Sequence, residues 1–192
     1  MSQMWSVDDD LELARAAARD SCSFAALYQR YVSSVYRYLM ARVGDAQDAQ
    51  DLTAETFLSA LRNINRFRGQ GTLIAWLLSI AHHAAADHFR RTHRGPSHDV
   101  PLAEAEDLPD PAGTAEDEAC HRLDRAQVLG ALQQLSLERA EAVVLRVVLG
   151  LSVAETGLVM GKSEAAVKML VHRALADLRQ RLVAMAKEED AR

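Results

Sequence analysis

Apolar residues recur every three or four positions along most of this chain, the spacing that gives a helix one buried face. No segment shows the strict alternation of apolar and polar residues that is typical of a half-buried strand. The Ala-rich, aromatic-poor composition agrees with this pattern. The chain is therefore predicted to be all-α, with helices over residues 8–19, 21–43, 45–63, 72–91, 121–135, 136–149, 152–160 and 163–182.

The stretch from Gly150 to Leu182 predicts two helices joined by a tight turn. Ser152 and Glu155 have the spacing of a capping box at the start of the first helix. Gly161 lies in the turn, and Ser163 is a good N-cap for the second helix. That helix has one apolar face, while small and basic residues occupy the first turns of the other. Such a helix suits the DNA major groove, although a plain helical hairpin with a solvated face is the alternative.

The helix that precedes this hairpin carries four valines. They are Val143, Val144, Val147 and Val148, and a regular α-helix over 136–149 is expected to turn them towards the core.

Charge is segregated along the chain. Residues 95–120 contain all four prolines and eight acidic residues, with no Lys or Arg. Such a segment cannot bury enough apolar surface to fold alone, so it is interpreted as a linker between two helical domains. The chain has a net charge of −5, but outside this segment 22 basic residues exceed 19 acidic ones. A binding partner meets the local charge of one segment, and not the net charge of the whole chain.

Three carboxylates share one face of the helix predicted over 45–63. Asp48, Asp51 and Glu55 are spaced at i, i+3 and i+7, which costs a little helix stability because like charges lie close together. This acidic strip is either a solvated face or a docking surface for a basic patch on a protein.

Basic residues surround an aromatic one in the loop of residues 63–72. Arg66 and Arg68 flank Phe67, and two glycines follow. An exposed ring between cations suits unstacked bases, since the cations hold phosphate while the ring stacks. The next helix ends in a second basic cluster, residues 88–94, which either contacts nucleic acid or only complements the helix C-terminus.

Several classes of protein are set aside. No apolar run approaches the ~20 residues of a membrane span, and the acidic N-terminus is unlike a signal peptide, so a cytoplasmic location is expected. The two cysteines, Cys22 and Cys120, fit no metal spacing, and the cluster His82, His83, Asp87 and His88 has no further ligand at a sensible distance. No nucleophile–base pair or phosphate loop is present, so neither an enzyme nor a cofactor is expected.

Two sets of motifs, one on each side of the linker, make the chain similar to a known family. The first set is FAALYQRYVSSVYRYLMARVG, DAQDLTAETFLSALRNINRFRG and AWLLSIAHHAAADHFRR, and the second is LQQLSLERAEAVVLRVVLGLSVAETGLVMGKSEAAVKMLVHRALADLR. Together they resemble the extracytoplasmic-function (ECF) sigma factors of the sigma-70 family, most closely those of actinobacteria. The resemblance covers roughly residues 20–186.

The resemblance implies a division of the chain into functional parts. The expected parts are an N-terminal extension (1–19), sigma region 2 (20–94), the acidic linker (95–120), sigma region 4 (121–186) and a tail (187–192). A protein of this kind is not an enzyme. It binds core RNA polymerase and directs it to the −10 and −35 elements of a promoter.

The resemblance also implies roles for particular residues. Asp48, Asp51 and Glu55 would bind the clamp helices of polymerase β′. The −10 element would be opened and read by Asn63, Asn65, Arg66, Phe67, Arg68, Gln70, His83, Asp87, Arg90 and Arg91. The −35 element would be contacted by Lys162, Ser163, Glu164, Ala165, Lys168, Met169, His172, Arg173 and Arg179, with Lys168 and His172 reading base edges.

The chain departs from the family pattern at two places. His82 and His83 stand where the family often has Arg and Asn, which lowers the positive charge near the −10 residues. Gly157 replaces a usual Ala inside the first hairpin helix, where glycine costs up to ~1 kcal/mol.

The implied partners are core polymerase (β′ clamp helices and β flap), promoter DNA and an anti-sigma factor, with no membrane insertion and a monomer when the chain is free of partners. A stand-alone helix-turn-helix regulator acting as a dimer is the first alternative. It leaves the acidic strip and the arginine–aromatic loop unexplained. A protein that binds an anti-sigma factor but has lost promoter recognition is the second.

Overall fold

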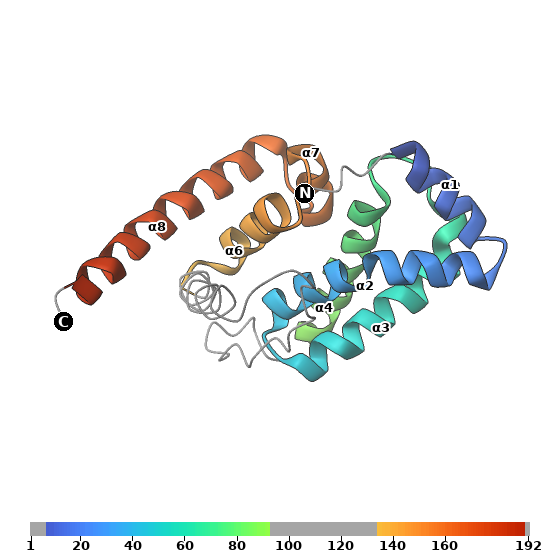
Figure 1. Cartoon of the computed structure of the whole chain (residues 1–192), viewed down its shortest axis with the longest axis horizontal. Coiled ribbons are helices and arrows are strands. Elements are labelled where there is room, and N and C mark those ends of the chain that lie inside the picture. Colours follow the sequence, from blue (N-terminus) through green and yellow to red (C-terminus); the bar gives the residue numbers. More distant parts are fainter. Residues whose placement is uncertain (1–6, 93–133, 191–192) are drawn as a thin grey trace, which may run out of the picture.

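The computed structural model of the chain describes residues 7–92 and 134–190 (Figure 1). Every regular element in these two ranges is helical, which confirms the all-α prediction. No helix within them is long and apolar enough to cross a membrane. The predicted linker and most of the helix predicted over 121–135 lie outside the described residues, as does Cys120.

The N-terminal unit contains four α-helices and a short 3₁₀ turn. They are α1 (Val7–Ala17), α2 (Ser21–Val43), α3 (Ala46–Asn63), the 3₁₀ turn η1 (Ile64–Arg66) and α4 (Leu73–Thr92). The side chains of Asp20 and Asp45 cap the N-termini of α2 and α3. Gly44 ends α2 in the left-handed conformation, with φ of 73°. Helices α2, α3 and α4 pack on one another, and α1 packs against α2, α4 and η1.

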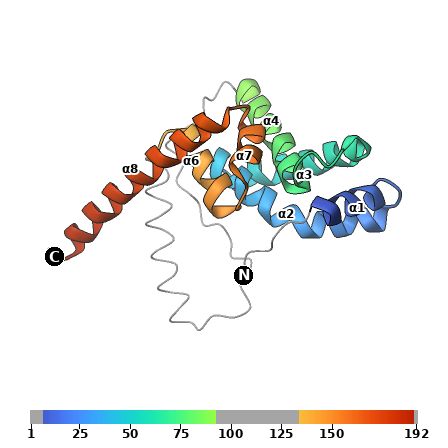
Figure 2. The same cartoon turned by 90° about the horizontal axis from the view of Figure 1, so that it is seen from above.

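The C-terminal unit contains the predicted hairpin and the helix before it. It consists of α6 (Leu137–Val143), the π-helical turn η2 (Val144–Val148), α7 (Val153–Met160) and α8 (Glu164–Asp190). Helix α8 packs against α6 and α7 and then extends away from the rest of the molecule towards the C-terminus (Figures 1 and 2).

The valines before the hairpin correct one prediction. Val143 and Val144 are buried as expected, but Val147 and Val148 are 59% and 51% exposed. The chain leaves the α-helical spacing at η2, where the amide of Leu149 donates to the carbonyl of Val144, five residues earlier. A π turn inserts one extra residue per turn, so the side chains that follow move to a different face.

The two units share one apolar core. Helix α4 packs against α7, and α2 contacts both α6 and η2. Buried residues of the C-terminal unit, among them Leu145, Leu151 and Val159, belong to the same cluster as the core of α2, α3 and α4. Figure 2 shows α6 and α7 lying beside α2 and α4. The two predicted DNA-reading units are therefore held together in this conformation.

Candidate polymerase and nucleic-acid interface

The acidic strip lies on the outer side of α3. Asp51 and Glu55 are exposed, and Asp48 is half-buried. Asp48 lies 3.2 Å from Nε2 of His88, and Glu55 lies 3.6 Å from Arg91, both on α4. The side-chain amide of Gln47 donates to Asp51. The strip thus runs beside the basic end of α4, and its carboxylates remain accessible along one edge.

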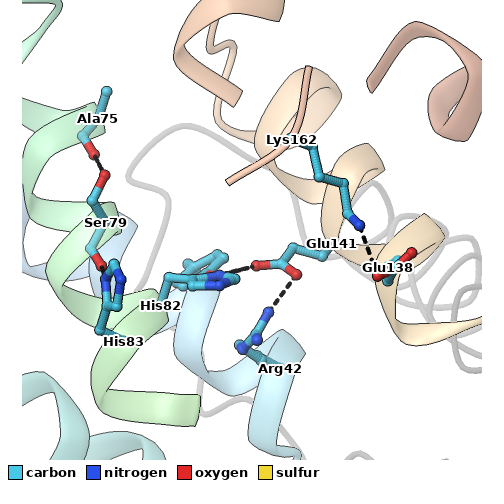
Figure 3. Close-up of polar contacts among 9 residues, drawn as sticks. Arg42, Ala75, Ser79, His82, His83, Glu138, Glu141 and Lys162 are labelled. Atoms are coloured by element: carbon cyan, nitrogen blue, oxygen red, sulfur yellow. Dashed lines mark hydrogen bonds and ion pairs between the residues drawn. The ribbon is translucent and has the colours of Figure 1, made fainter. Parts of the chain in front are cut away.

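The basic end of α4 is exposed and internally paired. His83, Asp87, Arg90 and Arg91 all lie on the surface. The guanidinium of Arg90 pairs with Asp87, one turn earlier. Nδ1 of His83 lies 2.6 Å from the carbonyl of Ser79, which leaves the other ring nitrogen on the outer side (Figure 3). A phosphate reaching this surface meets Arg90 and Arg91 beside a carboxylate of their own helix or of α3.

The loop of residues 63–72 is built on η1 and two glycines in the left-handed region. Gly69 and Gly71 have φ of 73° and 86°, values that favour glycine. Asn63 is half-buried and its amide donates to the carbonyl of Ser59. Four polar side chains of the loop face solvent, namely Asn65, Arg66, Arg68 and Gln70, while Thr72 at its end is buried.

Phe67 is not the exposed aromatic that the sequence suggested. Its side chain is only 7% exposed, and its ring centroid lies 5.8 Å from that of Trp76 on α4. Burial of this apolar ring against α4 stabilises the loop, because removing apolar surface from water lowers the free energy. In this conformation the ring is an anchor between two exposed arginines, with its faces unavailable for a base.

The hairpin of α7 and α8 has the predicted turn chemistry. The hydroxyl of Ser152 accepts from the amide of Glu155, and the Glu155 carboxylate accepts from the amide of Ser152, which confirms the capping box. Gly161 ends α7 with φ of 63°. The hydroxyl of Ser163 accepts from the amide of Ala166 and caps α8.

The predicted −35 residues lie along one exposed side of the hairpin. Lys162 is half-buried, and its ammonium lies 2.8 Å from the carboxylate of Glu138 on α6 (Figure 3). The other members are exposed on the cap and first turns of α8 and further along it, namely Ser163, Glu164, Ala165, Lys168, Met169, His172, Arg173 and Arg179. Helix α8 therefore presents a polar face with basic groups behind its first turn.

The sequence suggested only that Gly157 lowers the stability of its helix, but the structure requires a glycine at this position. A Cβ placed on Gly157 would lie 2.7 Å from the carbonyl oxygen of Lys162, nearer than such atoms approach. The amide of Lys162 also donates to the carbonyl of Gly157, so the turn is folded back onto this residue. The absence of a side chain allows α7 and the turn to approach each other.

A polar cluster between the two units was missed by sequence reasoning. Glu141 of α6 is 7% exposed, and its carboxylate accepts from the hydroxyl of Tyr38 at 2.5 Å. The same carboxylate pairs with Arg42 and lies 2.8 Å from Nδ1 of His82 (Figure 3). Tyr38 and Arg42 come from α2 and His82 from α4, so all three partners belong to the N-terminal unit.

These contacts set the ionisation of the cluster. Burial alone would raise the pKa of Glu141, but the contacts from His82, Arg42 and Tyr38 outweigh it and hold that pKa below the usual value. Burial first, and then the adjacent Glu141 charge, raise the pKa of Tyr38 well above its usual value, so the hydroxyl keeps its proton and donates. The sequence signal for this cluster was limited to a carboxylate directly before the apolar run from Ala142 to Leu145.

A second polar contact joins the units at the end of the loop of residues 63–72. Glu155, the capping-box residue of α7, accepts from the amide of Thr72 at 3.2 Å and from its hydroxyl. Burial tends to raise the pKa of Glu155, and its hydrogen bonds with Thr72 and Ser152 bring it below the usual value. The end of the loop in the N-terminal unit is thus tied to the start of the hairpin in the C-terminal unit.

Other groups of polar residues add no site. Within the described ranges, no three His, Cys, Asp or Glu side chains are arranged to hold a metal ion. Cys22 is exposed and unpaired with any other cysteine.

Two family patterns match this chain, one in each unit. Residues 27–95 match sigma-70 region 2, and residues 125–178 match sigma-70 region 4.

Characterised relatives extend over most of the chain. The ECF RNA polymerase sigma factor BldN of Streptomyces coelicolor is 41% identical over 179 residues, which cover 93% of this chain and 65% of BldN. The chain therefore spans just under two thirds of the length of that relative. The RNA polymerase sigma factor CarQ of Myxococcus xanthus is 36% identical over 172 residues, covering 90% of this chain and 95% of CarQ.

A solved structure shares the fold. The sigma factor RpoE of Bartonella quintana, in complex with the anti-sigma factor NepR, superposes with a TM-score of 0.66 at 22% identity. The superposition covers 83% of this chain and 96% of RpoE.

Proposed function

This chain belongs to the sigma-70 family as an RNA polymerase sigma factor of the ECF group, and from this premise we propose how its two units divide promoter recognition. Sigma factors of this kind act with core RNA polymerase to recognise promoters. The observation that carries the proposal is the separation of one acidic and two basic exposed surfaces over the two units. The chain acts as an initiation factor in the cytoplasm, and the polymerase performs the chemistry.

The acidic strip on α3 is the proposed polymerase contact. Asp51 and Glu55 are exposed, and they present negative charge that DNA would repel and a basic protein surface would attract. Asp48 stands at the inner end of the strip, where His88 already shares its charge. We assign the strip to the clamp helices of β′.

The loop and the end of α4 form the proposed −10 surface. Arg66 and Arg68 project from a loop whose backbone is fixed by the buried Phe67 and by two left-handed glycines. Fixed cations suit strand separation, since they can hold the phosphates of an unpaired strand while a base leaves the stack. His83, Asp87, Arg90 and Arg91 continue the surface along α4.

The start of α8 is the proposed −35 reader. The capped first turn carries small residues that let the helix approach base edges, and Lys168 and His172 lie one and two turns further on. Arg173 and Arg179 lie behind them, where phosphates would pass. Lys162 would have to exchange Glu138 for phosphate in order to take part.

The domain limits given above, with region 2 over 20–94, the linker over 95–120 and region 4 over 121–186, are retained as part of this proposal. So is an anti-sigma factor that covers the same surfaces. In its solved structure, RpoE from Bartonella quintana is in complex with the anti-sigma factor NepR.

The deciding experiment is run-off transcription with purified core RNA polymerase on a library of genomic fragments, read by sequencing. We expect new start sites that share two upstream motifs. Core binding without any starts would indicate a form that has lost promoter recognition. Absence of both, together with dimeric binding to a palindrome, would favour the stand-alone regulator.

A further inference from the structure

Helix α1 lies outside the segment that matches sigma-70 region 2, which begins at residue 27. In the structure it lies against α2, α4 and η1, so it touches the elements on both sides of the proposed −10 loop. It is therefore placed to influence the shape of that loop.

The central contact is made by Asp10, whose side chain is completely buried. One carboxylate oxygen accepts from the backbone amide of Leu73, the first residue of α4, at 2.8 Å. The other accepts from the hydroxyl of Tyr31 on α2 at 2.5 Å. Arg30 lies at 4.0 Å. A buried carboxylate is costly unless it is hydrogen-bonded, and both oxygens of this one are.

The Leu73 contact is a helix cap supplied from another element. The first amides of a helix have no partner within it, and a carboxylate there also interacts favourably with the helix dipole. Asp10 therefore fixes the point at which the loop ends and α4 begins. Burial, and then the hydrogen bond to Asp10, raise the pKa of Tyr31 well above its usual value, so its hydroxyl stays protonated and holds the carboxylate in place.

Two further contacts hold the rest of the loop. Leu11 follows Asp10, and a Cβ built on Gly69 would lie 3.6 Å from both of its terminal carbons. Gly69 itself has φ of 73°, a conformation that favours glycine. At the other end of the loop, η1 packs against α1. One short helix thus contacts the loop at its start, middle and end.

We propose that Asp10 is a positioning residue for promoter opening, and that α1 holds the loop of residues 63–72 in the shape that presents Arg66, Arg68 and Gln70 to the unpaired −10 strand. The inference rests on the −10 role proposed for that loop. Asp10 does not touch DNA. It acts through the amide of Leu73, while Leu11 limits the movement of Gly69.

The first test examines loop order in the full-length free protein by hydrogen–deuterium exchange. Asp10→Ala leaves the buried Leu73 amide without an acceptor, so peptides spanning 64–73 should exchange roughly tenfold faster. Peptides from α3 should be unchanged. Asp10→Asn should behave like the wild type, because its amide oxygen accepts from Leu73 and its NH₂ group can donate to Tyr31. Asp9→Ala, which removes an exposed carboxylate one residue earlier, is the matched control.

The second test separates positioning from simple stability, on a promoter recovered in the run-off screen. With Asp10→Ala, initiation on duplex DNA should fall roughly tenfold. Most of the loss should be recovered on a template whose −10 strands are already unpaired, and affinity for core polymerase should be unchanged. A residue that only stabilises the fold would lower initiation on both templates alike. Leu11→Ala keeps the Asp10 cap and should show the same recovery with faster exchange confined to residues 68–71. It serves as the second variant if Asp10→Ala does not fold.

Unchanged loop exchange in both folded variants would overturn the inference, as would equal losses on duplex and unpaired templates. If the wild type itself initiates nowhere, the proposed function fails. The exchange measurements then still decide whether α1 orders the loop, since they need neither DNA nor polymerase.

Discussion

The carboxylate of Glu141 on α6 lies 2.8 Å from Nδ1 of His82 on α4, so a charge of the C-terminal unit is bound within the N-terminal unit. Tyr38 and Arg42 complete its surroundings. A buried carboxylate with three partners is stable only while all of them stay in place. The contact between the two units is therefore specific as well as apolar, and we expect one substitution in the cluster to weaken it.

Replacing Glu141 should separate the two units. Glu141→Ala leaves Arg42 buried without its carboxylate, and the loss should weaken the contact by roughly 3 kcal/mol. Small-angle scattering should then show a larger radius of gyration, with little change in helix content by circular dichroism. Glu138→Ala is the control, since Glu138 lies on the same helix, is exposed, and among the described residues pairs with Lys162 of its own unit. An unchanged radius in Glu141→Ala would show that apolar packing alone holds the units.

The same contact should weaken in acid. The pKa of Glu141 is lowered while the two units are in contact. Its contribution to the stability of that contact is therefore fully present above the ordinary glutamate pKa of 4.5, and it is lost as pH falls through the lowered pKa. Energy transfer between dyes on the two units should decrease in that range. Glu141→Gln should show no corresponding step, because it has no proton to gain there. A step of equal size in both proteins would assign the effect to other carboxylates.

Replacing Gly157 with alanine, a better helix former, should destabilise the protein. In Gly157→Ala the new methyl group meets the Lys162 carbonyl at 2.7 Å, and overpacking of this kind costs about 1–3 kcal/mol, more than the ~1 kcal/mol gained in helix propensity. Thermal unfolding should show a lower midpoint. Ala154→Gly, at an exposed position of α7, measures helix propensity alone and should lower the unfolding midpoint. A raised midpoint in Gly157→Ala would mean that the turn moves freely.

Charge reversal on the acidic strip should abolish polymerase binding without unfolding the domain. Asp51→Lys with Glu55→Lys places two cations where a basic polymerase surface is proposed to bind, and like charges in contact are repelled. Affinity for core polymerase would be measured by fluorescence anisotropy, and folding by circular dichroism. Gln50→Lys adds a charge at an exposed position of α3 beside the strip and should bind nearly normally. Wild-type affinity in the double variant would remove this assignment.

Lys168→Ala should weaken −35 recognition. The loss should be roughly 1–3 kcal/mol and should depend on one base position if the ammonium reads a base edge. A smaller loss that is uniform across sequences would instead indicate a phosphate contact. Holoenzyme binding to −35 variants would distinguish these results. Gln180→Ala, at an exposed position further along α8, is the control.

Local patterns predicted the helices and their ends well. Ser152 and Glu155 indicated the capping box, and Gly161 indicated the turn between the hairpin helices, because each acts through neighbours in the sequence. Exposure was harder to predict. Phe67 sits among polar residues, yet Trp76 buries it, and a contact nine residues away leaves no mark on the local pattern.

Contacts between distant elements escaped prediction for the same reason. Asp10 resembles any acid in a first turn, and its role as the cap of α4 depends on how α1 packs. The π turn at Val144–Val148 likewise has an ordinary helical sequence, and only the fold shows that Val147 and Val148 face solvent.

The pairing of the acidic strip with the end of α4 would make the two proposed binding events, of polymerase and of DNA, interdependent. Glu55 lies 3.6 Å from Arg91, and Asp48 lies 3.2 Å from Nε2 of His88. A basic surface that takes those carboxylates leaves Arg91 to attract phosphate more strongly. Thermodynamic linkage requires the reverse as well, so DNA bound at α4 would raise the affinity of α3 for polymerase by the same factor. Neighbouring helices of one small domain would in this way favour the assembled complex over either partner alone.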